Sequence, residues 1–467
     1  MKLLHGGYTP RVAGRPSSEI SSQHALHQLK ISLIRAHNVY APVVKNGQKV
    51  NIGDIIASSE TPGGLLHLPS PAAGEIKLGN SDENRINIEP QADQTADKIF
   101  DPKEPQYITQ AEITETLTKS GIWPFFWSSN SGAAPSTSGE ERPKAIIVNC
   151  VISEPYRARG RVILANYWDD VIEGIRYLPR LLDEYGKVEV ILTQVNDPVA
   201  RRMYDELSGD AWTRIHSVPV IYPVEHPVVL MDSMRKARVG YQSGDLVWEI
   251  DVQGVAELGK CLSSGKTLSH RLVAIGGPGC KDPKHVLARV GTGVSELLGG
   301  DFDSGHTSVL RGGLLTGEPI DPEHASIQYD DDAFFCLPNF EKREFVTFLR
   351  PGFNRTSYFP AFATGLTRGR DRHITNALRG ELRPCIACGA CEKACPVQLL
   401  PQVLHRYLFR GLLDEAANCG LDRCIDCNLC TFVCPSKIEL GQQFAEAREQ
   451  LQAERNGSVT PVSEITN

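Results

Sequence analysis

RPCIACGACEKACP, from Arg383 to Pro396, and RCIDCNLCTFVCP, from Arg423 to Pro435, are the two stretches that decide the organisation of this chain. Each contains four cysteines in the order C-x2-C-x2-C-x3-C, with a proline directly after the fourth. Cysteine thiolates at this spacing are typical ligands of iron–sulfur clusters. The repeated motif therefore predicts an iron–sulfur domain near the C-terminal end of the sequence.

The two motifs are expected to exchange ligands between two [4Fe-4S] clusters. The first three cysteines of a motif are spaced to hold one cluster, whereas the fourth follows a longer gap and precedes proline, so it reaches the neighbouring cluster. Cluster I is therefore assigned to Cys385, Cys388, Cys391 and Cys434. Cluster II is assigned to Cys424, Cys427, Cys430 and Cys395.

Zinc binding and a disulfide framework are the alternative uses of these cysteines. Zinc sites built from C-x2-C pairs need four thiolates in two pairs, which gives no role to a third cysteine at the same spacing or to the trailing Cys-Pro. Cys419 lies five residues before the second motif and outside both. We interpret it as a spare thiol rather than as a ligand.

Apolar residues recur at helical spacing after each motif. Between the motifs, residues 397–417 contain Leu404, Leu408 and Leu412 at intervals of four, as in an amphipathic helix. Residues 436–455 repeat this pattern among charged residues. The C-terminal region is therefore predicted to be an α-helical dicluster ferredoxin rather than a compact β-hairpin one.

The composition is that of a soluble protein of about three or four domains. The chain has 467 residues, a net charge of −7 and no basic run interleaved with aromatic residues, which argues against nucleic acid as a partner. Nine of its 13 cysteines lie from Cys385 onward and the others are scattered singly, as expected in a reducing compartment. The sequence has neither the apolar core of a signal peptide at its start nor a run of about 18 apolar residues that could span a membrane.

Residues 30–90 are predicted to form a small β-sandwich of the lipoyl type, because short β-prone runs end at glycines such as Gly47, Gly53 and Gly74. Lipoyl and biotinyl domains carry a modified lysine at a hairpin tip. The corresponding loop here, Thr61 to His67, has no lysine. We therefore expect a docking scaffold rather than a swinging-arm carrier.

Residues 110–139 are predicted to form a helix, an aromatic cluster at Trp123–Trp127 that anchors a core, and a mobile loop of low apolar content.

Residues 144–222 alternate between buried strands and helices, which predicts a parallel sheet with Rossmann-like topology. Asp197 is a plausible N-cap for a helix that starts at Pro198. The turn after the first strand, Val151 to Tyr156, lacks the G-x-G-x-x-G pattern that lets a backbone approach a pyrophosphate. NADH binding is therefore not expected at this turn.

A second glycine-rich turn follows the strand at residues 271–275. It could cradle the phosphate of a flavin or nucleotide, or it could simply make a tight turn, and both interpretations stay open. Its residues are Gly276, Gly277, Pro278 and Gly279. Ser295 is a candidate N-cap for a later helix. Short strands follow over residues 301–337, then a turn of helix at 341–345 and a basic linker around Arg368 to His373.

A set of short motifs lies at residues 13–17, 120–124, 147–149, 254–260, 274–279, 342–345 and 351–354. Through these motifs the chain up to about residue 355 resembles the NqrA subunit of the sodium-translocating NADH:quinone oxidoreductase (Nqr). Through the cysteine motifs and the sequence CPSKIELG that starts at Cys434, the chain from residue 380 onward resembles the RnfC subunit of the related Rnf complex. Glu154-Pro155 after the first Rossmann-like strand is a further Rnf-like feature.

The resemblance implies a multidomain α/β and β protein with a barrel-sandwich domain, a Rossmann-like domain, a β-grasp domain and the ferredoxin. NqrA lacks clusters and is associated with quinone, whereas RnfC is associated with NADH, FMN and clusters. FMN thus stays open for this chain. The expected segments are 1–95 (barrel-sandwich), 96–143 (helix, aromatic cluster and loop), 144–240 (Rossmann-like), 241–355 (β-grasp-like), 356–380 (linker), 381–455 (ferredoxin) and 456–467 (tail).

The leading functional hypothesis is an electron-transfer subunit of an Nqr/Rnf-like respiratory complex, in which electron transfer could be coupled to Na⁺ or H⁺ translocation. Its partners would be the membrane-embedded and flavoprotein subunits, which would hold it peripherally on the cytoplasmic side of the membrane. The N-terminal body would be the docking part and the ferredoxin the electron port. The alternative is a soluble flavin-dependent NADH reductase of the cobalamin-reductase type, related to RnfC.

Overall fold

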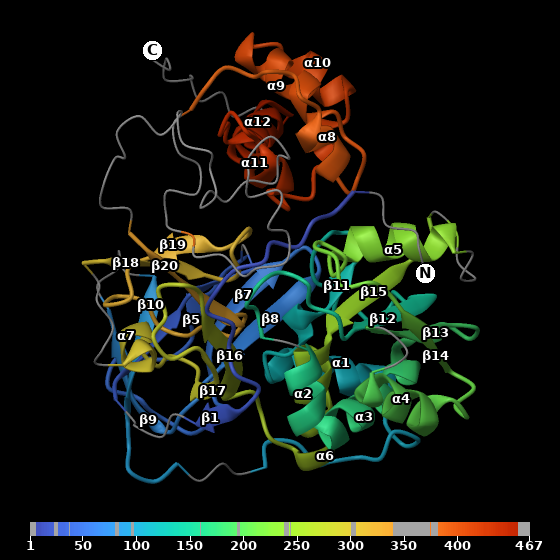
Figure 1. Ribbon diagram of the computed structural model, residues 1–467. Helices are drawn as coiled ribbons and strands as arrows, with labels where there is room; N and C mark the ends of the chain where they lie inside the picture. The colour runs from blue at the N-terminus through green and yellow to red at the C-terminus, as the bar shows by residue number, and fades with distance from the viewer. Residues whose placement is uncertain are drawn as a thin grey trace.

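The computed structural model describes a mixed α/β body with several sheets and a helical C-terminal lobe that sits on one side of it (Figure 1). The description covers residues 6–22, 27–36, 38–79, 84–94, 98–158, 160–193, 197–237, 242, 244–299, 305–339, 374 and 382–455. The helical turn predicted at 341–345, the predicted tail and all of the predicted linker but Ile374 lie outside these residues.

Residues 29–90 form two antiparallel sheets with a common apolar core. The first has the order β2 (Leu29–Ser32), β10 (Arg85–Pro90), β9 (Gly74–Leu78) and β6 (Lys49–Val50). The second has the order β5 (Ala41–Pro42), β7 (Ile55–Thr61) and β8 (Gly64–Pro69). Leu29, Ile31, Ile56, Leu68 and Ile88 are buried in this core. A short pair, β3 (Ile34–Arg35) and β4 (Asn38–Val39), extends this part.

The five-stranded sheet of the body is parallel apart from one short edge strand. Its order is β11 (Trp127–Ser128), β15 (Val247–Asp251), β12 (Ala145–Asn149), β13 (Lys187–Leu192) and β14 (Thr213–Ser217). All five residues of β12 are buried, as expected for a central strand covered on both faces. Its carboxyl end therefore lies at the centre of the sheet edge.

The helices beside this sheet supply most of its core. They are α1 (Gln110–Lys119), α2 (Gly160–Asn166), α3 (Trp168–Tyr177), α4 (Pro198–Leu207), α5 (Pro227–Lys236) and α6 (Val252–Ser264). Asp197 caps α4 by accepting a hydrogen bond from the amide of Val199 at 3.0 Å, as predicted. Residues 160–181 contain α2, α3 and a 3-10 turn at Leu178–Leu181. Pro179, which lacks the amide donor that an α-helix needs, lies in this turn directly after α3.

Strand β15 belongs to the same sheet as β12, although it lies in the segment 241–355 that the resemblance implies to be β-grasp-like. It pairs in parallel with β12 from Ala145–Val247 to Asn149–Asp251. The aromatic cluster explains this pairing, because Trp248 packs edge-on against Trp123 with their ring centres 5.7 Å apart. The strand and its following helix α6 therefore complete the parallel sheet.

The six-stranded sheet combines residues from both ends of the body. Its order is β1 (Ile20–Ser22), β17 (Lys284–Arg289), β16 (His270–Gly276), β20 (Ala333–Pro338), β18 (Thr307–Arg311) and β19 (Glu318–Ile320). Helix α7 (Val294–Leu298) begins after Gly293, so the cap expected at Ser295 lies two residues earlier. The pairing of β1 with β17 makes the N-terminal segment an edge strand of the six-stranded sheet.

The C-terminal lobe consists of short helices. They are α8 (Ala390–Ala394), α9 (Pro401–Phe409), α10 (Leu413–Asn418), α11 (Leu429–Val433) and α12 (Leu440–Arg455). The predicted helix between the cysteine motifs is interrupted at Gly411, whose φ of +68° a helix does not tolerate. Within the described part of the chain, no helix is long and apolar enough to cross a membrane.

Candidate iron–sulfur site

The two cysteine motifs adopt the same backbone conformation, 39 residues apart from Cys385 to Cys424. Left-handed residues recur at three matched positions. These pairs are Ala387 (φ 52°) with Asp426 (φ 51°), Gly389 (φ 69°) with Asn428 (φ 55°), and Gln398 (φ 56°) with Lys437 (φ 58°). Five of these six residues are not glycine, and left-handed backbone costs such residues free energy. The recurrence indicates that both loops are shaped to surround the same kind of group.

This conformation also presents backbone amides to a negatively charged group. Alternation of right- and left-handed residues turns successive N–H groups to one side, as in the loops that enclose iron–sulfur clusters. Two such amides already point at ligand sulfurs. The Ala387 amide lies 3.4 Å from Cys385 Sγ, and the Leu399 amide lies 3.3 Å from Cys395 Sγ. The loops therefore supply both thiolates and hydrogen-bond donors.

The four cysteines assigned to cluster I surround one small cavity between the two motifs. Three come from the first motif, and the fourth, Cys434, comes from the end of the second. Ile386, Gln402 and His405 complete the wall. The structure thus brings together Cys385, Cys388, Cys391 and Cys434.

The four cysteines assigned to cluster II also come together. Burial, and then the neighbouring Cys424 and Cys395, raise the pKa of the Cys427 thiol to about 12. Burial likewise raises the pKa of Cys430 well above its usual range, and the neighbouring thiols of Cys427 and Cys424 also raise it. Cys395, from the end of the first motif, therefore lies with the first three cysteines of the second.

The donor set fits cubane clusters. Burial raises the pKa of Cys391 and of Cys424 to about 11, so these thiols are neutral at pH 7 and release protons when iron binds them. Four thiolates on separate corners of a cubane lie farther apart than the ligands of a single ion. Within the residues that the structure describes, no three His, Cys, Asp or Glu side chains are close enough to hold one metal ion.

Cys419 lies at the end of α10, where it caps the helix at an exposed position. It is not among the residues that line the cavity of the first quartet.

The second quartet faces the body of the protein. The Tyr222 hydroxyl donates a hydrogen bond to the main-chain carbonyl of Cys427 at 2.8 Å, and the Asn428 side-chain amide donates to the Leu315 carbonyl at 2.9 Å. Tyr8 stacks on Phe432 with ring centres 5.9 Å apart. In contrast, Cys385 is exposed, and the side chain of Ile386 beside it is 63% exposed. The cluster I side of the lobe therefore faces away from these contacts.

The N-terminal segment reaches the same side of the lobe through Gly6 and Gly7. The Gly7 amide donates to the carbonyl of Ala394 at 3.0 Å. Gly6 has a φ of +69°, and a Cβ there would lie 2.6 Å from the carbonyl oxygen of Cys395. Only glycine fits this contact without displacing the backbone of a proposed cluster ligand.

The carboxyl end of β12 is occupied by side chains of the protein itself. Glu154 accepts hydrogen bonds from the Leu315 amide at 2.8 Å and from the amide and hydroxyl of Thr316 at 2.8 and 2.7 Å. Arg157 forms an ion pair with Asp332 at 2.7 Å. The turn from Val151 to Tyr156 thus joins the parallel sheet to the hairpin loop between β18 and β19.

The glycine-rich turn at residues 276–279 packs backbone against backbone. The Gly277 amide donates to the Gly14 carbonyl at 2.9 Å. With a φ of +104°, a Cβ on Gly277 would lie 2.3 Å from the carbonyl oxygen of Cys336. The close packing accounts for the glycine at this position, and the turn does not line the cavity of the first quartet.

The fold and the cysteine sites together define a class of protein, one with an NqrA-type α/β domain and a dicluster iron–sulfur domain. The family model described as "NqrA second alpha/beta domain" matches residues 108–267, a range that includes β15. The model described as "4Fe-4S dicluster domain" matches residues 384–439, which contain both motifs.

Full-length relatives are consistent with this class. The chain is 28% identical to the A subunit of the Na(+)-translocating NADH-quinone reductase of Hahella chejuensis, over 95% of this chain and 97% of the relative. It is 25% identical to the protein of the same name from Haemophilus influenzae, over 97% of this chain and all of the relative. The chain is thus similar to these A subunits over nearly its full length, and it also matches a 4Fe-4S dicluster domain.

Among solved structures, the chain is similar to one described as an NAD⁺-reducing [NiFe]-hydrogenase in the air-oxidized state. The similarity covers 91% of this chain and 81% of the other, with 11% identity and a TM-score of 0.42. A score this low supports no argument about function.

Sequence reasoning missed the residues that join the lobe to the body. Tyr222 and Cys427 are 205 residues apart, and neither Tyr222 nor Leu315 lies in a recognisable motif. The Gly6-Gly7 pair was the one local sign of a close contact in this region.

Proposed function

We propose that the chain is the iron–sulfur electron-transfer subunit of an Nqr/Rnf-like membrane-associated oxidoreductase. Two kinds of finding support this proposal, the full-length similarity to NqrA relatives and the dicluster domain match. Each cluster would be a [4Fe-4S] cubane that takes up and releases one electron at a time. Cluster I would be held by Cys385, Cys388, Cys391 and Cys434, and cluster II by Cys424, Cys427, Cys430 and Cys395.

The observation that carries the proposal is the exchange of the fourth cysteine between the motifs. Cys434 borders the cavity of the first quartet, and Cys395 lies beside Cys424 and Cys427. An exchange of this kind ties two clusters into one rigid unit, as a two-step electron relay requires. Electrons would pass between cluster II, beside the body, and cluster I, beside the exposed Ile386.

The residues of this chain would position and tune the clusters. Amides on the ligand sulfurs stabilise added negative charge, and hydrogen bonds to a ligand's main chain hold the loop in place. Tyr222 and Asn428 would act in this way on the cluster II loop, through the contacts at Cys427 and Leu315.

The body would be the docking part of the protein. Its hairpin tip from Thr61 to Gly64 carries no lysine for a swinging arm, and its glycine-rich turn is packed against Gly14. The partners would be the flavoprotein and membrane-embedded subunits of the complex, on the cytoplasmic side of the membrane. Coupling would be to Na⁺ or H⁺ movement, and NADH would bind to a partner rather than to this chain.

Anaerobic purification with iron and sulfide analysis tests the proposal. We expect about eight iron and eight sulfide per chain, and co-purification with membrane subunits identified by mass. Stoichiometric zinc without iron would reject the cluster assignment. A purified chain with bound flavin that oxidises NADH without partners would replace the proposal with the soluble reductase alternative.

A further inference from the structure

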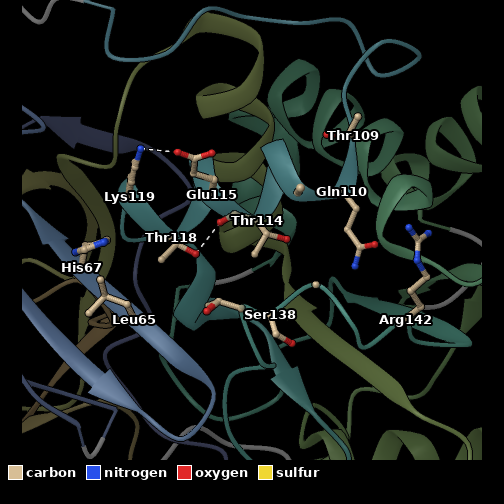
Figure 2. Close-up of a pocket in the computed structure, with 13 residues that line it drawn as sticks. Leu65, His67, Thr109, Gln110, Thr114, Glu115, Thr118, Lys119, Ser138 and Arg142 are labelled. Carbon is tan, nitrogen blue, oxygen red and sulfur yellow. Dashed lines mark hydrogen bonds and ion pairs between the residues drawn. The ribbon is translucent and has the colours of Figure 1, made fainter.

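A cavity of about 550 Å³ lies far along the chain from the cysteine motifs, between the hairpin strand β8, helix α1 and the loop at residues 137–139 (Figure 2). Figure 2 shows α1 along one side of it, with Leu65 and His67 at one end and Arg142 at the other. Cavities of 300–1,000 Å³ are typical of small-molecule sites. Its size is therefore that of a ligand site rather than of a packing defect.

The floor of the cavity is a polar stripe on a helix face that is buried. Gln110, Thr114 and Thr118 are spaced by four residues, so they lie on one face of α1, and all three are buried. Buried helix faces are normally apolar, because desolvating a polar group costs free energy unless it is hydrogen-bonded. The three polar side chains of this stripe therefore need hydrogen-bond partners.

Two of these side chains have partners and one has none. The Thr118 hydroxyl donates to the carbonyl of Thr114 at 2.6 Å, and the Gln110 amide donates to the carbonyl of Glu141 at 3.4 Å. Among the described residues, the hydroxyl of Thr114 has no hydrogen-bond partner, although the residue is only 4% exposed. A buried hydroxyl on the floor of a cavity, with donor and acceptor capacity unused, indicates a missing polar partner.

The walls carry one unbalanced positive charge. At one end Lys119 forms an ion pair with Glu115 at 2.6 Å, and His67 bonds to the Ser58 hydroxyl at 2.8 Å. Burial, followed by the charge of Lys119, lowers the pKa of His67, so this ring is neutral at pH 7. At the other end, Arg142 donates one hydrogen bond to the Leu182 carbonyl at 3.2 Å. In the part of the chain that the structure describes, it has no carboxylate partner.

The remaining wall is fixed to the lysine-free hairpin tip. The Gly63 carbonyl accepts a hydrogen bond from the Thr137 amide at 2.6 Å and another from the Ser136 hydroxyl at 3.2 Å. The loop that these bonds hold continues into Ser138, which lines the cavity and is labelled in Figure 2. The site therefore has a buried polar floor, a fixed wall and one guanidinium with donors to spare.

We propose that this cavity binds a small hydroxylated phosphomonoester, with its phosphate on Arg142 and a hydroxyl on Thr114. Guanidinium is suited to this role because its planar fork donates two parallel hydrogen bonds to a phosphate. The unused hydroxyl of Thr114 would exchange hydrogen bonds with the polyol part. Sugar phosphates and nucleoside monophosphates share this chemistry. Binding of either ligand would not involve the iron–sulfur clusters.

Isothermal titration of the full-length protein distinguishes these sources. The probes are ribose 5-phosphate, adenosine 5′-monophosphate and inorganic phosphate. We expect at least one organic phosphate to bind at least tenfold more tightly than inorganic phosphate. Tighter binding of the nucleotide would indicate that the base is also recognised, and equal binding would indicate a sugar phosphate site.

The variants Thr114→Val and Arg142→Gln test the two contacts. Each should weaken binding of the organic phosphate about tenfold or more. The controls are Thr116→Val, on the same helix but outside the cavity lining, and Arg201→Gln on α4, and both should bind as the parent does. Without ligand, Thr114→Val should melt at the same temperature as the parent or about 2 °C higher, because it removes an unpartnered buried hydroxyl.

The proposal is overturned if no probe binds at millimolar concentration, since the floor then holds water only. It is also overturned if inorganic phosphate binds as tightly as both organic probes, or if Thr114→Val leaves their affinity unchanged. Iron content is measured on every variant. Loss of iron would bear on the proposed electron-transfer function, whereas loss of phosphate binding would not.

Discussion

At the scale of single residues, the most informative cysteine is Cys395, because it belongs to one motif in sequence and packs with the other motif in space. It ends the first motif in sequence, yet it lies beside Cys424 and Cys427 of the second. The spacing alone predicted this exchange, since the three-residue gap and the proline carry the fourth cysteine away from the first three. Few site assignments depend so completely on local sequence.

Replacing Cys395 by serine should therefore damage cluster II rather than cluster I. The expected result is loss of about half of the iron, or conversion of cluster II to a three-iron form, with the spectrum of cluster I kept. Iron analysis and electron paramagnetic resonance of the reduced protein measure this. The exposed Cys419→Ser is the matched control and should retain both clusters. Loss of iron in the control, or an unchanged spectrum in Cys395→Ser, would contradict the assignment.

Glu249 is a second residue with a measurable signature. Burial, and then the nearby Asp251, raises the pKa of this carboxyl from 4.5 to about 8. The folded chain thus keeps a proton that the unfolded chain releases, and the free energy of unfolding falls as pH rises from about 4.5 to about 8. Glu249→Gln removes this pH-dependent loss. The free energy of unfolding of the variant should therefore rise relative to that of the parent across this pH window, by on the order of a few kcal/mol at pH 8.

Thermal unfolding at several pH values between 5 and 8.5 measures the effect. The melting temperature of Glu249→Gln should vary less with pH than that of the parent, with the largest difference at pH 8 and above. Glu184→Gln, at an exposed position, is the control and should follow the parent. Parallel curves for Glu249→Gln and the parent would show that the carboxyl is ionised in the folded protein.

At the scale of elements, sequence reasoning succeeded where the cause is local. Asp197 and Pro198 fix the start of α4, because capping depends on a few neighbouring residues. The break at Gly411 also has a local cause, a φ of +68°, but the leucine spacing predicted one helix through this residue. The pairing of β15 has no such local cause, because its partner β12 lies about a hundred residues earlier. The apolar pattern of a buried strand is the same in any sheet, so this pattern does not identify the partner strand. The pairing depends on distant residues such as Trp123.

The junction between the lobe and the body is also an element-scale feature that sequence could not give. It depends on Tyr222, whose hydroxyl bonds to the Cys427 carbonyl 205 residues away. Tyr222→Phe removes this one hydrogen bond and keeps the buried ring. Such a bond to a cluster loop is expected to stabilise the reduced cluster by drawing electron density from the ligand.

We therefore expect Tyr222→Phe to lower the reduction potential of cluster II by tens of millivolts and to leave cluster I unchanged. Redox titration followed by paramagnetic resonance measures both potentials. Tyr407→Phe, on α9 within the lobe, is a matched control. Equal shifts of both clusters would indicate a general loosening of the lobe, and no shift of cluster II would remove the tuning role of Tyr222.

At the scale of the whole molecule, the lobe and the body share one apolar core. Tyr222, Leu315 and Phe335 of the body are buried together with Leu421 and Leu429 of the lobe. The sequence predicted the two parts as separate domains joined by a linker, and this division came from the confinement of the cluster ligands to the last part of the chain. The common core shows that the proposed electron port and the proposed dock are packed as one unit.

Ending the chain before residue 382 separates the two roles. Electron transfer should be lost completely, because every proposed cluster ligand is removed. Association with membrane partners should be retained, because the proposed docking surfaces lie in the body.

The truncated body should nevertheless melt several degrees below the full-length chain, since Tyr222 and Leu315 become exposed to solvent when the lobe is removed. Membrane co-sedimentation and calorimetry measure these two properties, and the full-length Cys395→Ser variant, which keeps the lobe, is the control. If the truncated body leaves the membrane fraction while Cys395→Ser stays bound, the helices around the clusters are the docking element and the proposed division of roles is wrong.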